Sequence, residues 1–240
     1  MTTFVLVHGA WHGPWAWDRL TPLLHQAGAR TIAPALTLDG DVGLHTHVQE
    51  VIAALDAAAD DTLADALRDD LVLVGHSYAG LVVRQAADLR PDLVDHVILL
   101  DGWAGDDGAG MFGLAPEAFV HAIQAAARTS VDDQIPAPAP AMFGVTDPDD
   151  AAWLAQRLRP QPLRTFTETT RLSGAVNRIP GTGIYCRPQT YAFDQFAAAI
   201  GYRPIALDGP HDVMLTDPQA LARLLLQAHA GQFNNEKLQD

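Results

Sequence analysis

Residues 71–80 read Leu-Val-Leu-Val-Gly-His-Ser-Tyr-Ala-Gly. The four apolar residues predict a buried strand, and the small residues that follow predict a sharp turn into a helix over 80–89. Ser77 stands at this turn with Gly75 and Ala79 two places to either side, where a strained strand-to-helix turn needs small residues. Glycine is usual at the second of these places, so Ala79 is a mild departure. The pattern indicates a serine nucleophile at the end of a strand, with an ordinary turn serine as the alternative.

Short apolar runs alternate with helical patterns over most of the chain. The expected strands cover residues 4–7, 30–33, 71–74, 96–100, 183–186 and 204–207. The expected helices cover residues 15–27, 47–59, 80–89, 194–200 and 218–230. Unbroken apolar runs are typical of strands buried on both faces of a parallel sheet. The alternation therefore predicts a single α/β domain, with a mostly parallel central sheet and helices on both faces.

One long segment, residues 102–181, interrupts this alternation. It contains two expected helices, 116–127 and 148–158, and no convincing strand. A segment of this length between two strands is too long for a plain loop. We expect it to form a cap over the carboxyl edge of the sheet, where open α/β sheets bind ligands. Residues 1–101 and 182–240 then form the core.

The charge of the chain limits its partners. Of 240 residues, 15 are Lys or Arg and 29 are Asp or Glu, which gives a net charge of −14. This argues against nucleic acid, which needs basic patches, and against anionic membrane surfaces. It favours a neutral or cationic small-molecule substrate. A homodimer stays open as the oligomeric state.

The expected location is the cytoplasm. Cys186 is the only cysteine, so no intrachain disulfide can form. Residues 1–10 lack the basic stretch of a signal peptide, and the apolar runs are too short to span a bilayer.

A serine nucleophile needs a base, and His211 fits best among ten histidines. It follows the expected strand 204–207 in a tight Asp-Gly-Pro-His loop and precedes a helix. Such a loop fixes the direction of the imidazole, although a plain turn histidine is the alternative. His45 and His47 have no third ligand nearby, and a single cysteine excludes a thiolate cluster, so no metal and no cofactor are expected.

The third group should be a carboxylate that holds the imidazole in the correct tautomer. Such an acid commonly follows the strand before the base, but residues 187–191 contain none. Asp101 closes the apolar strand 96–100, where a carboxylate is costly without a partner. We therefore predict Asp101 as the acid, ahead of Asp194 and Asp106. A strand-end turn aspartate is the plain alternative.

Two backbone N–H groups are expected to bind a developing oxyanion. One belongs to Tyr78, directly after Ser77, and the other to Ala10, where Gly9 lets the backbone approach closely. We interpret His8 and His12 as braces of this loop, with a functional role as the alternative.

The insertion holds more large apolar side chains than two short helices can bury. They are Trp103, Met111, Phe112, Phe119, Phe143, Trp153 and Phe166. Some should face Ser77 and form an apolar roof, unless the cap folds on a small core of its own. The predicted pocket residues are Gly9, Trp11, Trp103, Phe112 and Trp153.

Three segments together resemble the α/β-hydrolase superfamily. They are FVLVHGAWHGPWAW at 4–17, LVLVGHSYAG at 71–80 and LDGPHDVMLT at 207–216. Within that superfamily they look most like the plant hydroxynitrile lyases, the methyl esterases and their bacterial esterase relatives, some of which hydrolyse small esters or aryl carbamates. The likeness covers about residues 4–101 and 183–230, and the cap matches poorly. The resemblance implies Ser77 and His211 in a catalytic triad, with Ala10 and Tyr78 as oxyanion donors.

Two departures bear on the reaction. The resembling lyases carry a lysine just after the catalytic histidine and a threonine where Gly9 stands, whereas Asp212 follows His211 here. The usual acid position of the family is also vacant. We therefore predict a serine esterase that acts on a small, largely apolar ester, lactone or carbamate. A hydroxynitrile-lyase-type enzyme and a small-molecule receptor on the same fold are the alternatives.

Overall fold

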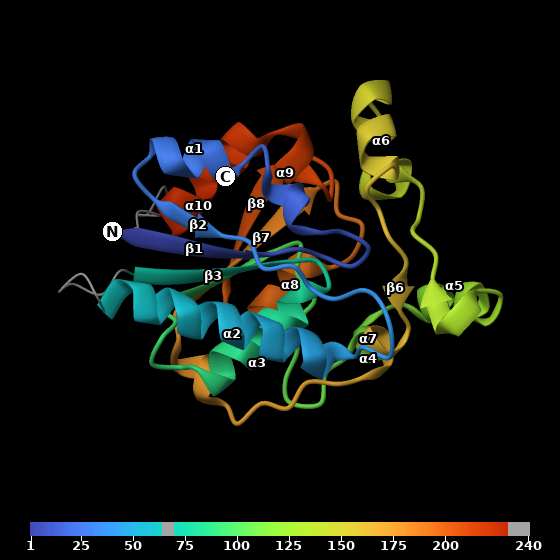
Figure 1. The fold of residues 1–240 in the computed structure, drawn as a ribbon, viewed down its shortest axis with the longest axis horizontal. Coiled ribbons are helices and arrows are strands. Elements are labelled where there is room, and N and C mark those ends of the chain that lie inside the picture. Colours follow the sequence, from blue (N-terminus) through green and yellow to red (C-terminus); the bar gives the residue numbers. More distant parts are fainter. Residues whose placement is uncertain (64–69, 230–240) are drawn as a thin grey trace, which may run out of the picture.

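A computed structural model describes residues 1–63 and 70–229, in which a central sheet is covered by helices on both faces (Figure 1). The strands of this sheet are β1 Thr2–Val7, β2 Arg30–Ile32, β3 Asp70–His76, β4 His96–Leu100, β7 Gly181–Arg187 and β8 Arg203–Asp208. They lie in the order β2-β1-β3-β4-β7-β8, and every neighbouring pair is parallel. Each overlaps one of the strands expected from the sequence, and the α/β fold class is confirmed.

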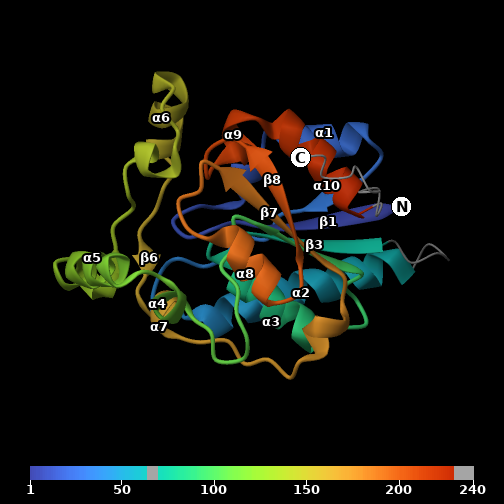
Figure 2. The ribbon, with the colours of Figure 1, turned by 180° about the vertical axis from the view of Figure 1, so that it is seen from behind.

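The helices form one layer on each face of the sheet (Figures 1 and 2). One layer holds α1 Thr21–Gln26, α9 Val213–Thr216 and α10 Pro218–His229, and the other holds α2 Leu44–Leu63, α3 Ala79–Leu89 and α8 Phe193–Ala199. The central strands β1, β3 and β4 are buried along nearly their whole length, as their unbroken apolar runs predict. None of the helices in the described residues combines the length and hydropathy that a bilayer crossing needs.

The single helix expected over 15–27 is wrong. A 3₁₀ turn covers Pro14–Trp17, and α1 begins separately at Thr21. Pro22 explains the break, because it lacks the N–H that a continuous helix would need and is favoured in a first helical turn. Residue 230 of the last expected helix lies outside the described residues, as do residues 231–240 of the expected core.

Most of the insertion lies beyond the carboxyl ends of the strands, and its last part, with η4, runs back past α3 to the start of β7 (Figures 1 and 2). Its elements are α4 Met111–Leu114, α5 Glu117–Arg128, η2 Val131–Asp133, β5 Gln134–Ile135, η3 Pro140–Phe143, α6 Pro148–Ala155, β6 Gln161–Pro162, α7 Arg164–Thr167 and η4 Ala175–Arg178. The antiparallel pair β5–β6 was not expected, because strands of two residues carry no alternating pattern. Gly181, which the sequence assigns to the insertion, begins β7. We call residues 102–180 the cap segment.

Candidate active site

Ser77 lies in a strained turn between β3 and α3. Its φ of 53° is uncommon for a residue with a side chain. The end of β4 holds this turn: Ser77 N–H donates to the carbonyl of Leu100 at 3.0 Å, and the Ser77 carbonyl accepts from Trp103 N–H at 3.0 Å. A Cβ on Gly75 would lie 2.6 Å from a methyl of Val83, so the close approach of strand and helix needs glycine there. Such over-determined strain is typical of functional turns.

His211 and Asp101 meet although 110 positions separate them along the chain. Nδ1 of His211 lies 2.9 Å from Oδ2 of Asp101, whose side chain is 2% exposed. The second oxygen of Asp101 accepts the backbone N–H of Cys186 at 2.7 Å. Both carboxylate oxygens therefore have donors, which compensates for their burial. Because Nδ1 of His211 is hydrogen-bonded to Asp101, only Nε2 can interact with Ser77. Ser77 and His211 line one common cavity, described below.

The other two acids considered from the sequence do not contact His211. Asp106 is exposed, in the loop after β4. Asp194 lies in the first turn of α8, where its N–H donates to Gln189. The structure thus brings Asp101, rather than either of them, to the histidine.

The loop after β1 carries Ala10, and the cap segment holds that loop from outside. Trp11 has a φ of 65°, and three hydrogen bonds secure it. Its N–H donates to Oε1 of Gln161 at 3.0 Å, its indole N–H donates to the carbonyl of Ile135 at 3.1 Å, and its carbonyl accepts from Arg159 N–H at 2.9 Å. All three partners belong to the cap segment. The backbone on which Ala10 N–H lies is therefore set by core and cap together.

His8 and His12 both brace this loop. His8 donates through Nδ1 to the Gly9 carbonyl and accepts Leu36 N–H at Nε2, so it is a neutral imidazole. Burial lowers its pKa to about 3. His12 instead faces two acceptors, the carbonyl of Ala10 at 2.8 Å and the carboxylate of Asp212 at 2.9 Å.

The charge state of His12 follows from these partners. Burial by itself lowers its pKa, but the charge and hydrogen bond of Asp212 outweigh that effect and raise it. A buried His12–Asp212 ion pair thus ties the loop after β1 to the loop that carries His211.

His76, next to Ser77, completes the buried polar surroundings of Ser77 and His211. Its Nε2–H donates to the carbonyl of His211 at 3.1 Å. Burial, with the nearby His211 and His12, holds its pKa well below the ordinary value. Among the described residues, His76, His211 and Asp212 are the one set whose donor atoms are spaced closely enough for a metal. His211 Nδ1 already has a partner in Asp101, and His76 Nε2 has one in the carbonyl of His211, so we assign this set to the packing around Ser77 and His211.

Tyr78 packs behind Ser77 with its hydroxyl held in place. The hydroxyl donates to Nδ1 of His47 at 3.0 Å, and Nε2–H of His47 donates to the carbonyl of Thr37 at 2.7 Å. Burial raises the pKa of the tyrosine and lowers that of His47, so both remain neutral at pH 7. This chain fixes the residue whose N–H is the second expected oxyanion donor.

A small, largely aromatic cavity lies against Ser77 and His211; we call it the inner chamber. Its volume is about 80 Å³, and Ser77, Tyr78, Ala10 and His211 line it. Two of the pocket residues predicted from the sequence, Trp11 and Trp103, line the inner chamber. The insertion contributes four more of its large apolar residues to the lining: Met111, Phe119, Phe143 and Phe166.

Three predicted pocket residues do not line the inner chamber. Trp153 contacts Trp15 and Arg157 instead. Phe112 packs edge-on to Phe166, behind the wall. Gly9 lies against Ser77, where a Cβ would come within 3.1 Å of the Ser77 Cβ.

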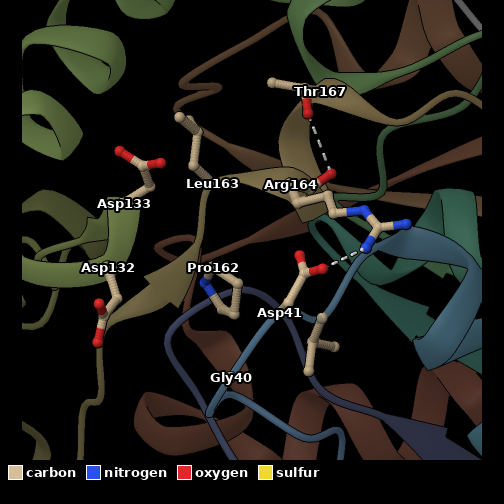
Figure 3. Close-up of a pocket in the computed structure, with 9 residues that line it drawn as sticks. Gly40, Asp41, Asp132, Asp133, Pro162, Leu163, Arg164 and Thr167 are labelled. Atoms are coloured by element: carbon tan, nitrogen blue, oxygen red, sulfur yellow. Dashed lines mark hydrogen bonds and ion pairs between the residues drawn. The ribbon is translucent and has the colours of Figure 1, made fainter.

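A larger cavity of about 500 Å³ lies elsewhere, between the loop at residues 40–42 and the β6–α7 segment (Figure 3). On one side of it Arg164 forms an ion pair with Asp41 at 3.1 Å, and Asp132 and Asp133 lie on the opposite side. Its lining includes neither Ser77 nor His211. Size alone would therefore select a cavity that neither Ser77 nor His211 lines.

A family model described as "Alpha/beta hydrolase family" matches residues 4–224. The chain belongs to the alpha/beta hydrolase family. The fold, the strained serine turn after β3 and the late histidine loop agree with this membership. The predicted resemblance is thereby confirmed, since relatives of this hydrolase carry the names esterase, methylesterase and hydroxynitrile lyase.

Three relatives show the range of this similarity. The carbendazim hydrolyzing esterase of Nocardioides sp. (strain SG-4G) is 29% identical over 94% of this hydrolase and 98% of its own length. The alpha-hydroxynitrile lyase of Arabidopsis thaliana is 33% identical, but over only 43% of this chain and 40% of its own. An extracellular alpha/beta-hydrolase from a Paenibacillus species superposes with a TM-score of 0.81 at 21% identity, covering 95% of this chain and 99% of that one. The last similarity shows the fold alone.

Several site residues escaped the sequence analysis. Gln161 is buried and supports Trp11, but a single glutamine in an irregular segment carries no signal. Asp212 was noted only as a departure from the lyases, although it forms the buried pair with His12. Tyr191 and Phe193, on the chamber wall, follow β7 near the vacant acid position. Their position just after a core strand, at the carboxyl edge of the sheet, could have indicated that they line the cavity.

Proposed function

We propose that this hydrolase is a serine esterase that cleaves a small, largely apolar ester, lactone or carbamate through an acyl-enzyme. One observation carries the proposal: His211, whose Nδ1 is paired with Asp101, lines the same chamber as Ser77, Ala10 and Tyr78. Nucleophile, base, orienting acid and oxyanion donors are the four parts that acyl transfer to serine needs.

In the proposed mechanism, the hydroxyl oxygen of Ser77 attacks the substrate carbonyl while Nε2 of His211 takes its proton. Asp101 keeps Nδ1 protonated and stabilises the imidazolium. Negative charge on the former carbonyl oxygen is met by the N–H groups of Ala10 and Tyr78. The imidazolium then protonates the leaving group as the bond to it breaks. Water, activated by the same histidine, releases the acid and restores Ser77. No step calls for a cofactor.

The full-length likeness to the carbendazim hydrolyzing esterase supports a neutral, small substrate. So does the lining of the chamber, which is mostly aromatic. The cap segment supplies Met111, Phe119, Phe143 and Phe166 to that lining, and we propose that it acts as the lid of the site. We keep the cytoplasm as the proposed location, because the lone Cys186 cannot form an intrachain disulfide.

A cyanohydrin lyase is the second enzyme considered, and Asp212 opposes it. The resembling lyases have a lysine at this place, whereas here the position holds a buried carboxylate paired with His12. No cation is therefore offered at that position. A receptor that binds and barely turns over is the non-enzyme alternative, and the following experiment separates it.

The test is replacement of Ser77 by Ala. We expect wild-type protein to turn over p-nitrophenyl acetate many times per site, and Ser77→Ala to lose this activity. A serine-reactive phosphonate should label Ser77 alone, as mass spectrometry of peptides will show. Ser173→Ala is the matched control and should keep full activity. Release of one equivalent without turnover would favour the receptor, and labelling at Ser130 or Ser173 would refute the assignment.

A further inference from the structure

Two cavities meet at His211. The first is the inner chamber of about 80 Å³ that contains Ser77. The second, which we call the outer groove, measures about 460 Å³. The cap turn at residues 141–144 forms one wall of the outer groove, and the segments around Arg187 and Pro210 form the other. Met142, Phe143, Thr190 and His211 line both cavities and so form the neck between them.

The catalytic groups divide between the cavities unequally. Ser77 and the two oxyanion donors, Ala10 and Tyr78, line only the inner chamber, whereas His211 lines both. When the tetrahedral intermediate collapses, the imidazolium of His211 must give its proton to the leaving-group oxygen or nitrogen. The leaving group must therefore lie on the His211 side, and the oxyanion on the side of Ala10 and Tyr78.

The neck is well fixed on the side of the cap. The carbonyl of Phe143 accepts the N–H of Asp212 at 3.2 Å, and the Phe143 ring lies nearly parallel to His211 with centroids 6.4 Å apart. The side chain of Asp212, the residue after His211, forms an ion pair with His12. The same contacts of Asp212, with Phe143 and with His12, therefore fix both His211 and the entrance to the outer groove.

We propose that the outer groove is the leaving-group subsite and binds a bulky, uncharged alcohol, phenol or amine portion of the substrate. The inner chamber then holds a small apolar acyl group. This assignment rests on the proposed esterase function and specifies its substrate class. Ligand pockets usually measure about 300–1,000 Å³, a range that the groove reaches and the chamber does not.

The chemistry of the groove walls fits a neutral, apolar group. Met142 is 70% exposed, an unusual state for a large apolar side chain, and it stands at the neck. Phe143, Pro188 and Pro210 add further apolar surface. The cation of the groove, Arg187, is compensated by Asp208, with Nη2 and Oδ1 2.7 Å apart. The walls therefore offer no uncompensated cation to an acidic leaving group.

Two series of esters test the assignment on the whole protein. In the first, acetate is kept and the alcohol grows from methyl through butyl to benzyl and 2-naphthylmethyl. In the second, methanol is kept and the acyl group grows from acetyl to butyryl, octanoyl and benzoyl. With hydrolysis followed by pH-stat titration, we expect kcat/KM to stay level or rise along the first series. It should fall at least tenfold along the second.

A variant of the groove sharpens the test. Ala141 is exposed and lines only the outer groove, so Ala141→Trp should fill it without disturbing the core. We expect kcat/KM for 2-naphthylmethyl acetate to fall at least tenfold and that for methyl acetate to change less than twofold. Ala139→Trp is the matched control, since Ala139 is exposed two positions before Ala141 and lines neither cavity; it should change neither value.

The outcomes separate this assignment from the function on which it rests. Equal losses on both esters, no loss on either, or a preference for large acyl groups would overturn the subsite while leaving the esterase intact. Failure of every ester in both series, with no phosphonate labelling of Ser77, would overturn the proposed function and the subsite with it.

Discussion

Asp101 shows how one residue can be assigned from its hydrogen bonds. Oδ1 accepts Cys186 N–H at 2.7 Å, and Oδ2 lies 2.9 Å from His211 Nδ1. The first bond fixes which way the carboxylate faces. The proton on Nδ1 can then point only at Oδ2, and Nε2 stays free to act as a base.

We predict that Asp101→Asn lowers kcat by about 10³–10⁴-fold with the fold intact. Cys186 N–H will hold the amide oxygen, so the amide NH₂ must face His211 Nδ1. That donor forces the imidazole into the tautomer with hydrogen on Nε2, which cannot take the proton of Ser77. Asp194→Asn is the matched control and should keep kcat within twofold. Steady-state kinetics with p-nitrophenyl acetate decide, and the reverse pattern would move the acid to Asp194.

At this scale, much of the candidate site could be predicted from the sequence. Ser77 and His211 could be found because a tight turn with small neighbours leaves a local pattern. Asp101 could be ranked first because an acid that closes a buried strand needs a partner. Phe112 and Trp153 were placed in the pocket wrongly, since nothing local tells which face of a short helix turns toward Ser77. That choice depends on packing partners distant in sequence, such as Trp15 for Trp153.

Among the elements, the contact between the loop after β1 and the β5–β6 pair matters most for the chemistry. Gln161 opens β6, is 1% exposed, and uses both ends of its amide. Oε1 accepts Trp11 N–H, and Nε2 donates to the hydroxyl of Thr165 at 2.8 Å. A two-residue strand thus positions the peptide next to Ala10. Sequence reasoning could not find this, because neither strand is long enough to show a period.

We predict that Gln161→Met lowers kcat for p-nitrophenyl acetate about tenfold, less than the fall of about 10²–10³-fold expected when an oxyanion donor is lost outright. Methionine fills the same space but accepts poorly, so Trp11 N–H would lose its partner and the Ala10 peptide would shift. KM should change little, because the oxyanion forms only after binding. Gln156→Met, on the exposed end of α6, is the control. A fall in Tm with kcat unchanged would show that Gln161 stabilises the cap segment without positioning the donor.

At the scale of the whole molecule, buried histidines set how stability depends on pH. His8 and His76 are fully buried and neutral. Burial lowers the pKa of His8 to about 3 and holds the pKa of His76 well below its ordinary value. In the unfolded chain both would titrate near 6.5. As pH falls below that value the unfolded chain binds protons that the folded chain refuses, so stability is lost. His12 acts in the opposite direction, because its raised pKa adds stability below pH 6.5 that is lost as pH rises.

We predict that the free energy of unfolding falls steeply between pH 6 and pH 4, and that His8 accounts for a defined part of the slope. A histidine protonated only in the unfolded chain contributes about 1.4 kcal/mol per pH unit. Replacing His8 by Gln, which can still donate to Gly9 and accept from Leu36, should reduce the slope by about that amount. His25→Gln, at an exposed position in α1, is the matched control and should leave the slope nearly unchanged. Urea unfolding at half-unit steps of pH measures both variants. An unchanged slope in His8→Gln would mean that His8 takes up a proton in the folded protein, contrary to its bond from Leu36 N–H.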